Sequence, residues 1–158
     1  MPPFEDYAMK GRTYRYFAGK PLYTFGYGLS YTTFSYRGLR VPKKAINAGD
    51  PLITEVTVAN IGMRDGDEVV QLYLSFPDVP GAPLHALRGF KRVHLKSGES
   101  QNVRFELKDR DLSMVTEAGE PIIAEGKYSL SIGGGQAATG APTLSATFQV
   151  KGRKTLPE

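Results

Sequence analysis

The stretch "QNVRFELK" (residues 101–108) alternates polar and apolar side chains along its length. Val103, Phe105 and Leu107 are the apolar members, and polar residues stand between them. Successive side chains of a β-strand point to opposite faces, so the apolar positions share one face and the polar positions share the other. This pattern predicts a strand with one face in a core and one face in water.

The same period of two recurs along most of the chain after residue 30. Clear repeats occupy residues 52–60, 67–76, 126–134 and 143–150, and weaker ones occupy residues 31–41 and 87–95. Segments rich in Gly, Asn and Asp separate them, at residues 47–50, 60–67, 96–100, 117–120 and 133–142. About seven short strands with one apolar face each predict an all-β protein with an antiparallel β-sandwich.

The strand "DEVVQLYLSF" is expected to contribute Val70, Leu72 and Leu74 to the core. Gln71 and Tyr73 alternate with these residues and are expected on the outer face. A single helical turn is predicted at "DRDLSM", with Asp109 or Asp111 as its cap.

The N-terminal segment differs from the rest because it lacks alternation and is rich in aromatic rings. Eleven of the 17 Phe and Tyr residues lie between Phe4 and Tyr36. A complete sandwich can be built without this segment, so we interpret residues 1–28 as an interdomain arm, residues 29–152 as the sandwich and residues 153–158 as a C-terminal tail. The Gly- and Ala-rich stretch 133–142 is predicted to be a mobile connection between two strands.

Composition limits the classes of function. The 158 residues suit one domain, and 41% hydrophobic with 23% charged residues indicate a globular chain. The net charge of +4 comes from scattered Lys and Arg, which argues against a nucleic-acid partner. The absence of Cys excludes disulfides and thiolate metal sites. No apolar run predicts a membrane span or a signal peptide, so no membrane partner is expected.

No residue pattern predicts catalysis. Glycoside cleavage requires two carboxylates held across a bond, whereas the acidic residues here fall mainly in turns or at outward strand positions. His85 and His94 are nine residues apart and lack the further ligands that a metal site needs. The run "SIGGGQAATG" is followed by neither a helix nor a Lys-Ser/Thr pair, so it does not predict a phosphate loop. We therefore expect no catalytic residue, no metal and no cofactor.

The remaining candidate is the aromatic arm. Its rings either pack against protein or stack on the faces of sugars. Large exposed apolar patches are usually interfaces, which favours protein as the partner. The candidate contact residues are Tyr14, Tyr16, Phe17, Tyr23, Phe25 and Tyr27.

Several strings resemble one known family. "PPFEDYAMKGRTYRYF" (residues 2–17) and "GKPLYTFGYGLSYTTFSY" (19–36) resemble the segment that joins the second domain to the third in family 3 glycoside hydrolases, a group of β-glucosidases and β-xylosidases. "VANIGMRDGDEVVQLYLSFP" (58–77) resembles the central strands of their C-terminal fibronectin type III-like domain. "LRGFKRVHLKSGES", "LKDRDLSMV" and "EGKYSLSIGG" resemble its later segments. Thr24 departs from the family, which commonly has Pro there.

The resemblance implies an immunoglobulin-like (fibronectin type III-like) β-sandwich and a non-catalytic accessory role. The catalytic residues of such an enzyme lie in upstream domains, and those domains are the implied partners. The implied roles are interdomain packing, stability and substrate positioning, with polysaccharide binding through exposed Tyr residues as the alternative. For the whole enzyme we expect a periplasmic or secreted location, with the cytoplasm as the alternative. Separated from those domains, residues 1–28 are expected to be mobile or to pack against a neighbouring copy.

Overall fold

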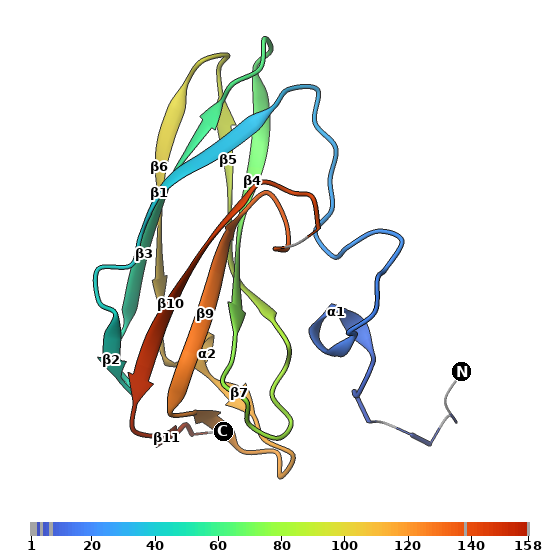
Figure 1. The fold of residues 1–158 in the computed structure, drawn as a ribbon, viewed down its shortest axis with the longest axis vertical. Coiled ribbons are helices and arrows are strands. Elements are labelled where there is room, and N and C mark those ends of the chain that lie inside the picture. Colours follow the sequence, from blue (N-terminus) through green and yellow to red (C-terminus); the bar gives the residue numbers. More distant parts are fainter. Residues whose placement is uncertain (1–2, 4, 7, 138, 158) are drawn as a thin grey trace.

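Two β-sheets lie face to face and enclose the core (Figure 1). The computed structural model describes residues 3, 5–6, 8–137 and 139–157. One sheet has the order β1-β3-β6, with β1 (Phe34–Arg40), β3 (Leu52–Asn60) and β6 (Ser100–Leu107). The other has the order β2-β10-β9-β4-β5, with β2 (Ala45–Asn47), β10 (Thr143–Lys151), β9 (Gly126–Gly133), β4 (Gly66–Ser75) and β5 (Ala86–Leu95).

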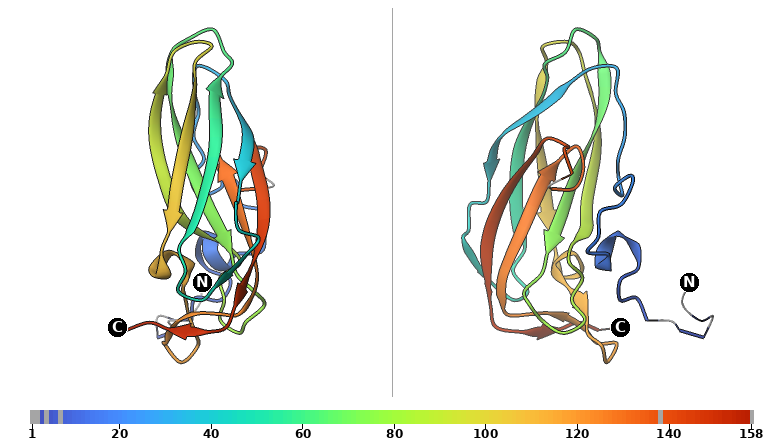
Figure 2. Two further views of the ribbon diagram at one scale, coloured as in Figure 1. Left: turned by 90° about the vertical axis from the view of Figure 1, so that its left-hand side faces the viewer. Right: turned by 45° about the vertical axis from the view of Figure 1, so that its right-hand side comes forward.

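The predicted antiparallel sandwich is confirmed. Neighbouring strands pair antiparallel in both sheets, apart from β2, which runs parallel to β10. The turned views in Figure 2 show the two sheets as separate layers along the long axis of the molecule. Such an arrangement buries one face of each sheet against the other.

Hydrophobic burial follows the predicted alternation. The apolar residues of β6, with Val103, Phe105 and Leu107, are buried, and the polar residues between them are exposed. The facing β9 contributes Leu130 and Ile132, both fully buried. The inner faces therefore form a single core, as the period of two predicted.

Strand β4 departs from the predicted pattern. Val70, Leu72 and Leu74 are in the core, but Gln71 and Tyr73 on the opposite face are buried as well. The two side chains lie on the outer face, as expected, but the N-terminal arm covers them, which the alternation did not predict.

A small third sheet closes the lower end of the sandwich in Figure 1, in the order β11-β8-β7. Its strands are β7 (Met114–Val115), β8 (Pro121–Ile123) and β11 (Lys154–Thr155). Leu156, which follows β11, is buried in the main core. Much of the segment described from sequence as a tail is thus packed against the sandwich.

Two short helices lie outside the sheets, α1 (Thr13–Tyr16) and α2 (Asp109–Leu112). The helical turn predicted at residues 109–114 is therefore present, and the Asp111 carboxylate accepts a hydrogen bond from the Lys108 amide at 2.9 Å. Among the described residues, neither helix has the length and apolar character needed to cross a membrane.

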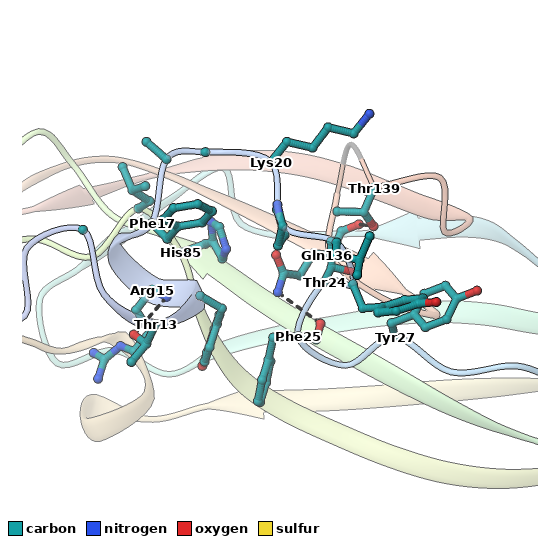
Figure 3. Close-up of a pocket in the computed structure, with 18 of the residues that line it drawn as sticks. Thr13, Arg15, Phe17, Lys20, Thr24, Phe25, Tyr27, His85, Gln136 and Thr139 are labelled. Carbon is teal, nitrogen blue, oxygen red and sulfur yellow. Dashed lines mark hydrogen bonds between the residues drawn. The ribbon is translucent and has the colours of Figure 1, made fainter. Parts of the chain in front are cut away.

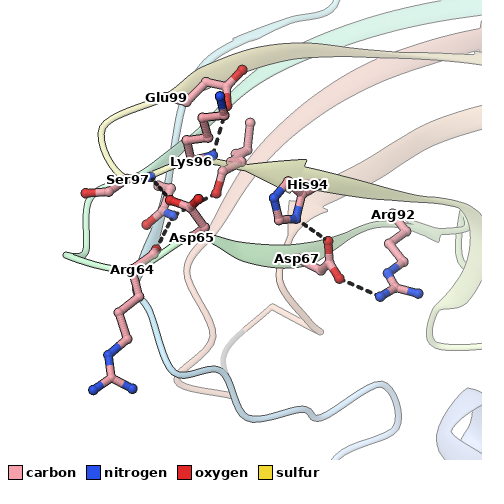
Figure 4. Close-up of polar contacts among 10 residues, drawn as sticks. Arg64, Asp65, Asp67, Arg92, His94, Lys96, Ser97 and Glu99 are labelled. Atoms are coloured by element: carbon pink, nitrogen blue, oxygen red, sulfur yellow. Dashed lines mark hydrogen bonds and ion pairs between the residues drawn. The ribbon is translucent and has the colours of Figure 1, made fainter.

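The turn between β3 and β4 is held in place by polar contacts (Figure 4). The Ser97 amide donates to Asp65 at 2.9 Å. Farther along β4, the Asp67 carboxylate accepts a hydrogen bond from Arg92 and lies 2.9 Å from His94 Nδ1. Hydrogen bonds from Arg92 and then His94 lower the pKa of Asp67 below its ordinary value.

Tyr128, at the start of β9, ties this strand to the segment that precedes it. Its fully buried hydroxyl donates to the Ala124 carbonyl at 2.9 Å and accepts from the Ala124 amide at 3.1 Å. A Tyr that bonds back to the backbone at this corner is a hallmark of immunoglobulin-like sandwiches. Burial raises the pKa of Tyr128 to about 12, so the hydroxyl stays protonated.

We expect Tyr128→Phe to lower the free energy of unfolding by about 1–3 kcal/mol, because it leaves two buried backbone groups without a partner. Denaturant unfolding measures this change. Tyr31→Phe is the control, since Tyr31 is 94% exposed and should tolerate the same substitution. Equal stabilities of the two variants would contradict this role of Tyr128.

Candidate contact surface of the aromatic arm

The arm lies along the outer face of the five-stranded sheet (Figure 1, blue). At α1, the Leu84 amide donates to the Arg15 carbonyl at 2.8 Å. The Leu87 amide of β5 donates to the Tyr14 hydroxyl at 3.1 Å. The helical turn of the arm is thereby joined to β5 and to the loop before it.

Two side chains of the sandwich donate to carbonyl groups of the arm, and a third supports them. Gln136 Nε2 donates to the Phe25 carbonyl at 3.1 Å. The Tyr73 hydroxyl lies 3.3 Å from the same carbonyl and donates its proton to Gln71 Oε1 at 2.6 Å, which orients the Gln71 amide. Gln71 Nε2 donates to the Gly26 carbonyl at 3.0 Å. These contacts explain the burial of Gln71 and Tyr73 on the outer face of β4.

Gln136 gives the Gly-rich connection a contact that the sequence did not predict. Gln136 is buried, and its backbone carbonyl accepts a hydrogen bond from the Thr139 hydroxyl at 2.6 Å. Residues 133–142 connect two strands, as predicted, and through Gln136 they also contact the arm. The glycines let this segment turn, and Gln136 uses the turn to reach the arm.

Gly26 permits the close approach of the arm to β4. Its φ of +77° lies in the left-handed region, which residues with a side chain rarely adopt. A Cβ atom there would lie 2.2 Å from Gln71 Oε1 and 2.7 Å from the Tyr73 hydroxyl. Only glycine fits this position without displacing the arm.

The candidate aromatic residues divide into two groups. The rings of Tyr14 and Phe25 stack at 4.0 Å between centroids, with an interplanar angle of 7°. Tyr14 also meets Tyr73 edge-on at 6.2 Å. Tyr14 thus packs on the sheet, and Phe25 packs on Tyr14 while remaining 46% exposed. Burial raises the pKa of Tyr73 to about 12.

The outer group faces away from the sheet. Tyr23 and Tyr27 lie 5.4 Å apart with tilted rings, and both are more than half exposed. Phe17 is also exposed, whereas Tyr16 is half-buried beneath the Arg15 guanidinium, 5.6 Å from its ring centre. Figure 3 shows Phe17, Phe25 and Tyr27 around a concave surface that His85, Gln136 and Thr139 also line.

Three further exposed apolar residues, in or next to the arm, were not among the candidates. Leu22, Leu29 and Tyr31 are 92%, 88% and 94% exposed. Leu22 precedes Tyr23 and Leu29 follows Tyr27 by two residues, so a count of apolar residues over 22–31 would have included them. With Tyr23 and Tyr27 they give residues 22–31 an exposed apolar side.

The two histidines have separate environments. His94 is exposed beside Asp67. His85 is half-buried, 5.9 Å from the Tyr14 ring and 6.2 Å from the Tyr73 ring, and burial lowers its pKa below the ordinary value. The described part of the chain contains no cluster of three or more His, Asp or Glu side chains that could hold a metal ion.

Comparison with known proteins agrees with this architecture. The family model for the fibronectin type III-like domain matches residues 68–136, which run from β4 to the Gly-rich connection after β9. This part of the chain is a fibronectin type III-like domain. The resemblance noted from the sequence is thereby confirmed, and the domain is of the kind found in family 3 glycoside hydrolases.

Curated relatives of the domain are much longer proteins. It is 39% identical over 134 residues to a xylan 1,4-β-xylosidase of Xylanibacter ruminicola, covering 84% of this chain and 15% of the relative. It is also 39% identical to the probable β-glucosidase D of Aspergillus niger, covering 87% of this chain and 21% of the relative. The chain thus spans about a fifth or less of the length of these relatives.

Solved structures of much longer enzymes also contain a region that resembles this chain. β-Glucosidase 3B from Thermotoga neapolitana, in complex with α-D-glucose, matches 92% of this chain with a TM-score of 0.78 and 33% identity. The matching region is 19% of that enzyme. The GH3 β-glucosidase of Bifidobacterium adolescentis matches 81% of this chain with a TM-score of 0.71 and 31% identity, over 18% of its own length.

We expect Gly26→Ala to loosen the arm. The substitution places a side chain in the left-handed region, at a cost of about 1–2 kcal/mol, and pushes it against Gln71 and Tyr73. Hydrogen exchange should show weaker protection of the Leu84 and Leu87 amides, which bond to the arm.

Gly28→Ala is the matched control. A Cβ atom on Gly28 would have no neighbour within 4 Å, and its φ lies outside the left-handed region. Protection should therefore stay at the wild-type level in this variant. If both variants exchanged alike, Gly26 would not determine the position of the arm.

Proposed function

We propose that this chain is a non-catalytic accessory domain of a longer family 3 β-glycosidase that hydrolyses β-glucosides or β-xylosides. In this proposal the arm is the joint to the upstream catalytic domains, and its exposed side packs against them. The proposed consequences are a fixed orientation between the domains, higher stability of the whole enzyme and help in positioning its substrate.

The two-sided arm is the observation that carries the proposal. Its inner side, with Tyr14 and Phe25, is bound to the sheet by hydrogen bonds and ring stacking. Its outer side presents Leu22, Tyr23 and Tyr27 to solvent. Contiguous apolar surface of this kind is typical of protein interfaces. Because the sheet already orders the arm, less conformational entropy is lost when a partner binds.

The placement of the acidic residues supports a role without catalysis. Asp67, Asp109 and Glu120 each pair with a basic side chain near the surface. Asp111 bonds to a backbone amide at the start of α2. These carboxylates therefore have structural partners and do not face one another across the concave surface of the arm. Clear turnover of aryl β-glucosides or β-xylosides by the repurified chain would contradict this part of the proposal.

Polysaccharide binding is the second candidate function. Aromatic rings beside polar groups are a common way to bind sugars, and Tyr23 and Tyr27 lie beside Thr139 and Gln136 on the concave surface. Pull-down on insoluble cellulose and xylan separates the candidates. If the wild type is retained and Tyr23→Ala and Tyr27→Ala are not, sugar binding is supported. If the wild type stays in the supernatant, this candidate is rejected.

The main proposal predicts that Leu22→Ser with Tyr27→Ser weakens binding to the upstream catalytic region, produced as a separate chain, by about tenfold or more. Removing two apolar side chains from the centre of an interface has this effect because their burial is lost. Isothermal titration calorimetry measures the affinity.

Met63→Ser is the matched control. Met63 is 96% exposed and apolar, but it lies in the turn between β3 and β4. The control should bind like the wild type. Equal loss in both variants would show that the effect is not specific to the arm, and no binding by the wild type would reject the interdomain proposal.

A further inference from the structure

Arg15 of α1 (Figure 3) and Arg88 of β5 lie on neighbouring segments. The Leu84 amide donates to the Arg15 carbonyl, and the Leu87 amide, next to Arg88, donates to the Tyr14 hydroxyl. Burial lowers the pKa of Arg88, and the nearby charge of Arg15 lowers it further. Like charges that share a partly buried site repel each other and are costly to desolvate, so an anion bound to both would stabilise them.

Neither guanidinium has a carboxylate partner. Among the residues that the structure describes, no acidic oxygen lies within 4.0 Å of either side chain. The Nε atoms of both arginines are buried and lack a hydrogen-bond partner. Arg12, by contrast, also lies on the arm and pairs with Asp6 at 3.0 Å. Among the arginines that the structure describes, Arg15 and Arg88 are the two with a buried and unpartnered Nε atom.

The remaining groups that act on Arg88 do not complete the site. Asp111 is the carboxylate whose charge reaches Arg88, and the Tyr14 and Tyr16 hydroxyl groups act more weakly. The Asp111 carboxylate is already engaged with the Lys108 amide. The Asp111 carboxylate thus lies beyond ion-pair distance and already accepts a hydrogen bond. Within the described residues, the two positive charges have no directly bound counter-charge.

Arg88 is held in a defined position. It is the extra residue of a β-bulge, because Leu72 pairs with Gly89 and Tyr73 pairs with Leu87. Bulges redirect side chains and are frequent beside functional sites. The Arg88 guanidinium donates to the Ser113 carbonyl at 2.5 Å and lies 5.3 Å from the centre of the Phe76 ring. A guanidinium fixed in this way is ready to bind a second acceptor.

We propose that Arg15 and Arg88 together bind a carboxylate side chain supplied by the upstream catalytic region of the same polypeptide. Guanidinium groups bind carboxylates through paired N–H donors. The Nε atoms are buried, but both residues are only half-buried as a whole, so we place the carboxylate on the remaining N–H groups of the two guanidiniums. Arg15 lies near the N-terminal end of the chain, so an upstream region joined to that end is present at high effective concentration. This inference rests on the proposed interdomain function and specifies a polar contact beside the apolar one.

The proposal predicts opposite consequences of Arg15→Gln with and without the partner. In the isolated chain the substitution removes repulsion, so protection of the Leu84 and Leu87 amides from hydrogen exchange should be unchanged or stronger. In the complex with the separately produced upstream region, affinity should fall by about tenfold, because a carboxylate loses its partner. Arg88→Gln should act in the same direction, but Arg88 also bonds to Ser113, so Arg15→Gln is the deciding variant.

Lys20→Gln is the control, because it removes one exposed positive charge from the same arm. Its affinity should stay close to that of the wild type. If Arg15→Gln binds as tightly as Lys20→Gln, the carboxylate contact is refuted while the interdomain function stands. If the wild type does not bind the upstream region at all, both proposals are refuted.

A titration of the isolated chain tests the site itself. Sodium acetate, compared with sodium chloride at the same ionic strength, should shift the Arg15 and Arg88 Nε–H resonances with saturation. The shift of Arg88 should weaken in Arg15→Gln. Identical responses to acetate and chloride would overturn the preformed carboxylate site.

Discussion

Hydrogen bonding between the outer face of the five-stranded sheet and the backbone of the arm fixes the position of the arm, on which the proposed contact surface depends. An irregular segment cannot satisfy its carbonyl groups through a β-ladder, and buried carbonyls without partners are costly. Gln71 and Gln136 supply the missing donors, and Tyr73 holds the Gln71 amide in place by donating to its Oε1 atom. The expectation that the arm would be mobile or pack against a neighbouring copy is not what the structure shows, because residues 13–27 lie on their own sandwich.

An arm bound to the sheet differs from a flexible linker in what it can determine between two domains. A flexible linker sets only the distance between domains, whereas a segment bound to a sheet also sets their orientation. The inner rings are used for attachment to the sandwich. The outer residues, Leu22, Leu29 and Tyr31 among them, are then exposed on an ordered segment. In the proposed enzyme, the two arginines at α1 and β5 add a charged contact beside them.

The sandwich could be predicted from sequence because burial between two sheets imposes a period of two, as in β6. The attachment of the arm could not be predicted in this way. Gln71 and Tyr73 occupy outward positions, where a polar residue is equally compatible with water and with a covering segment. The stacking of Tyr14 on Phe25 joins residues eleven positions apart in a segment without periodicity. The bulge that redirects Arg88 depends on the register between β4 and β5, which alternation alone does not reveal.

The arm is part of the folded sandwich, and hydrogen exchange of two amides can establish this. The Leu84 and Leu87 amides donate to the Arg15 carbonyl and the Tyr14 hydroxyl. We expect both amides to be protected in the full chain and to exchange rapidly in a chain of residues 29–158, while the Leu72 amide inside β4 stays protected in both. Equal exchange of Leu84 and Leu87 in the two chains would contradict the account.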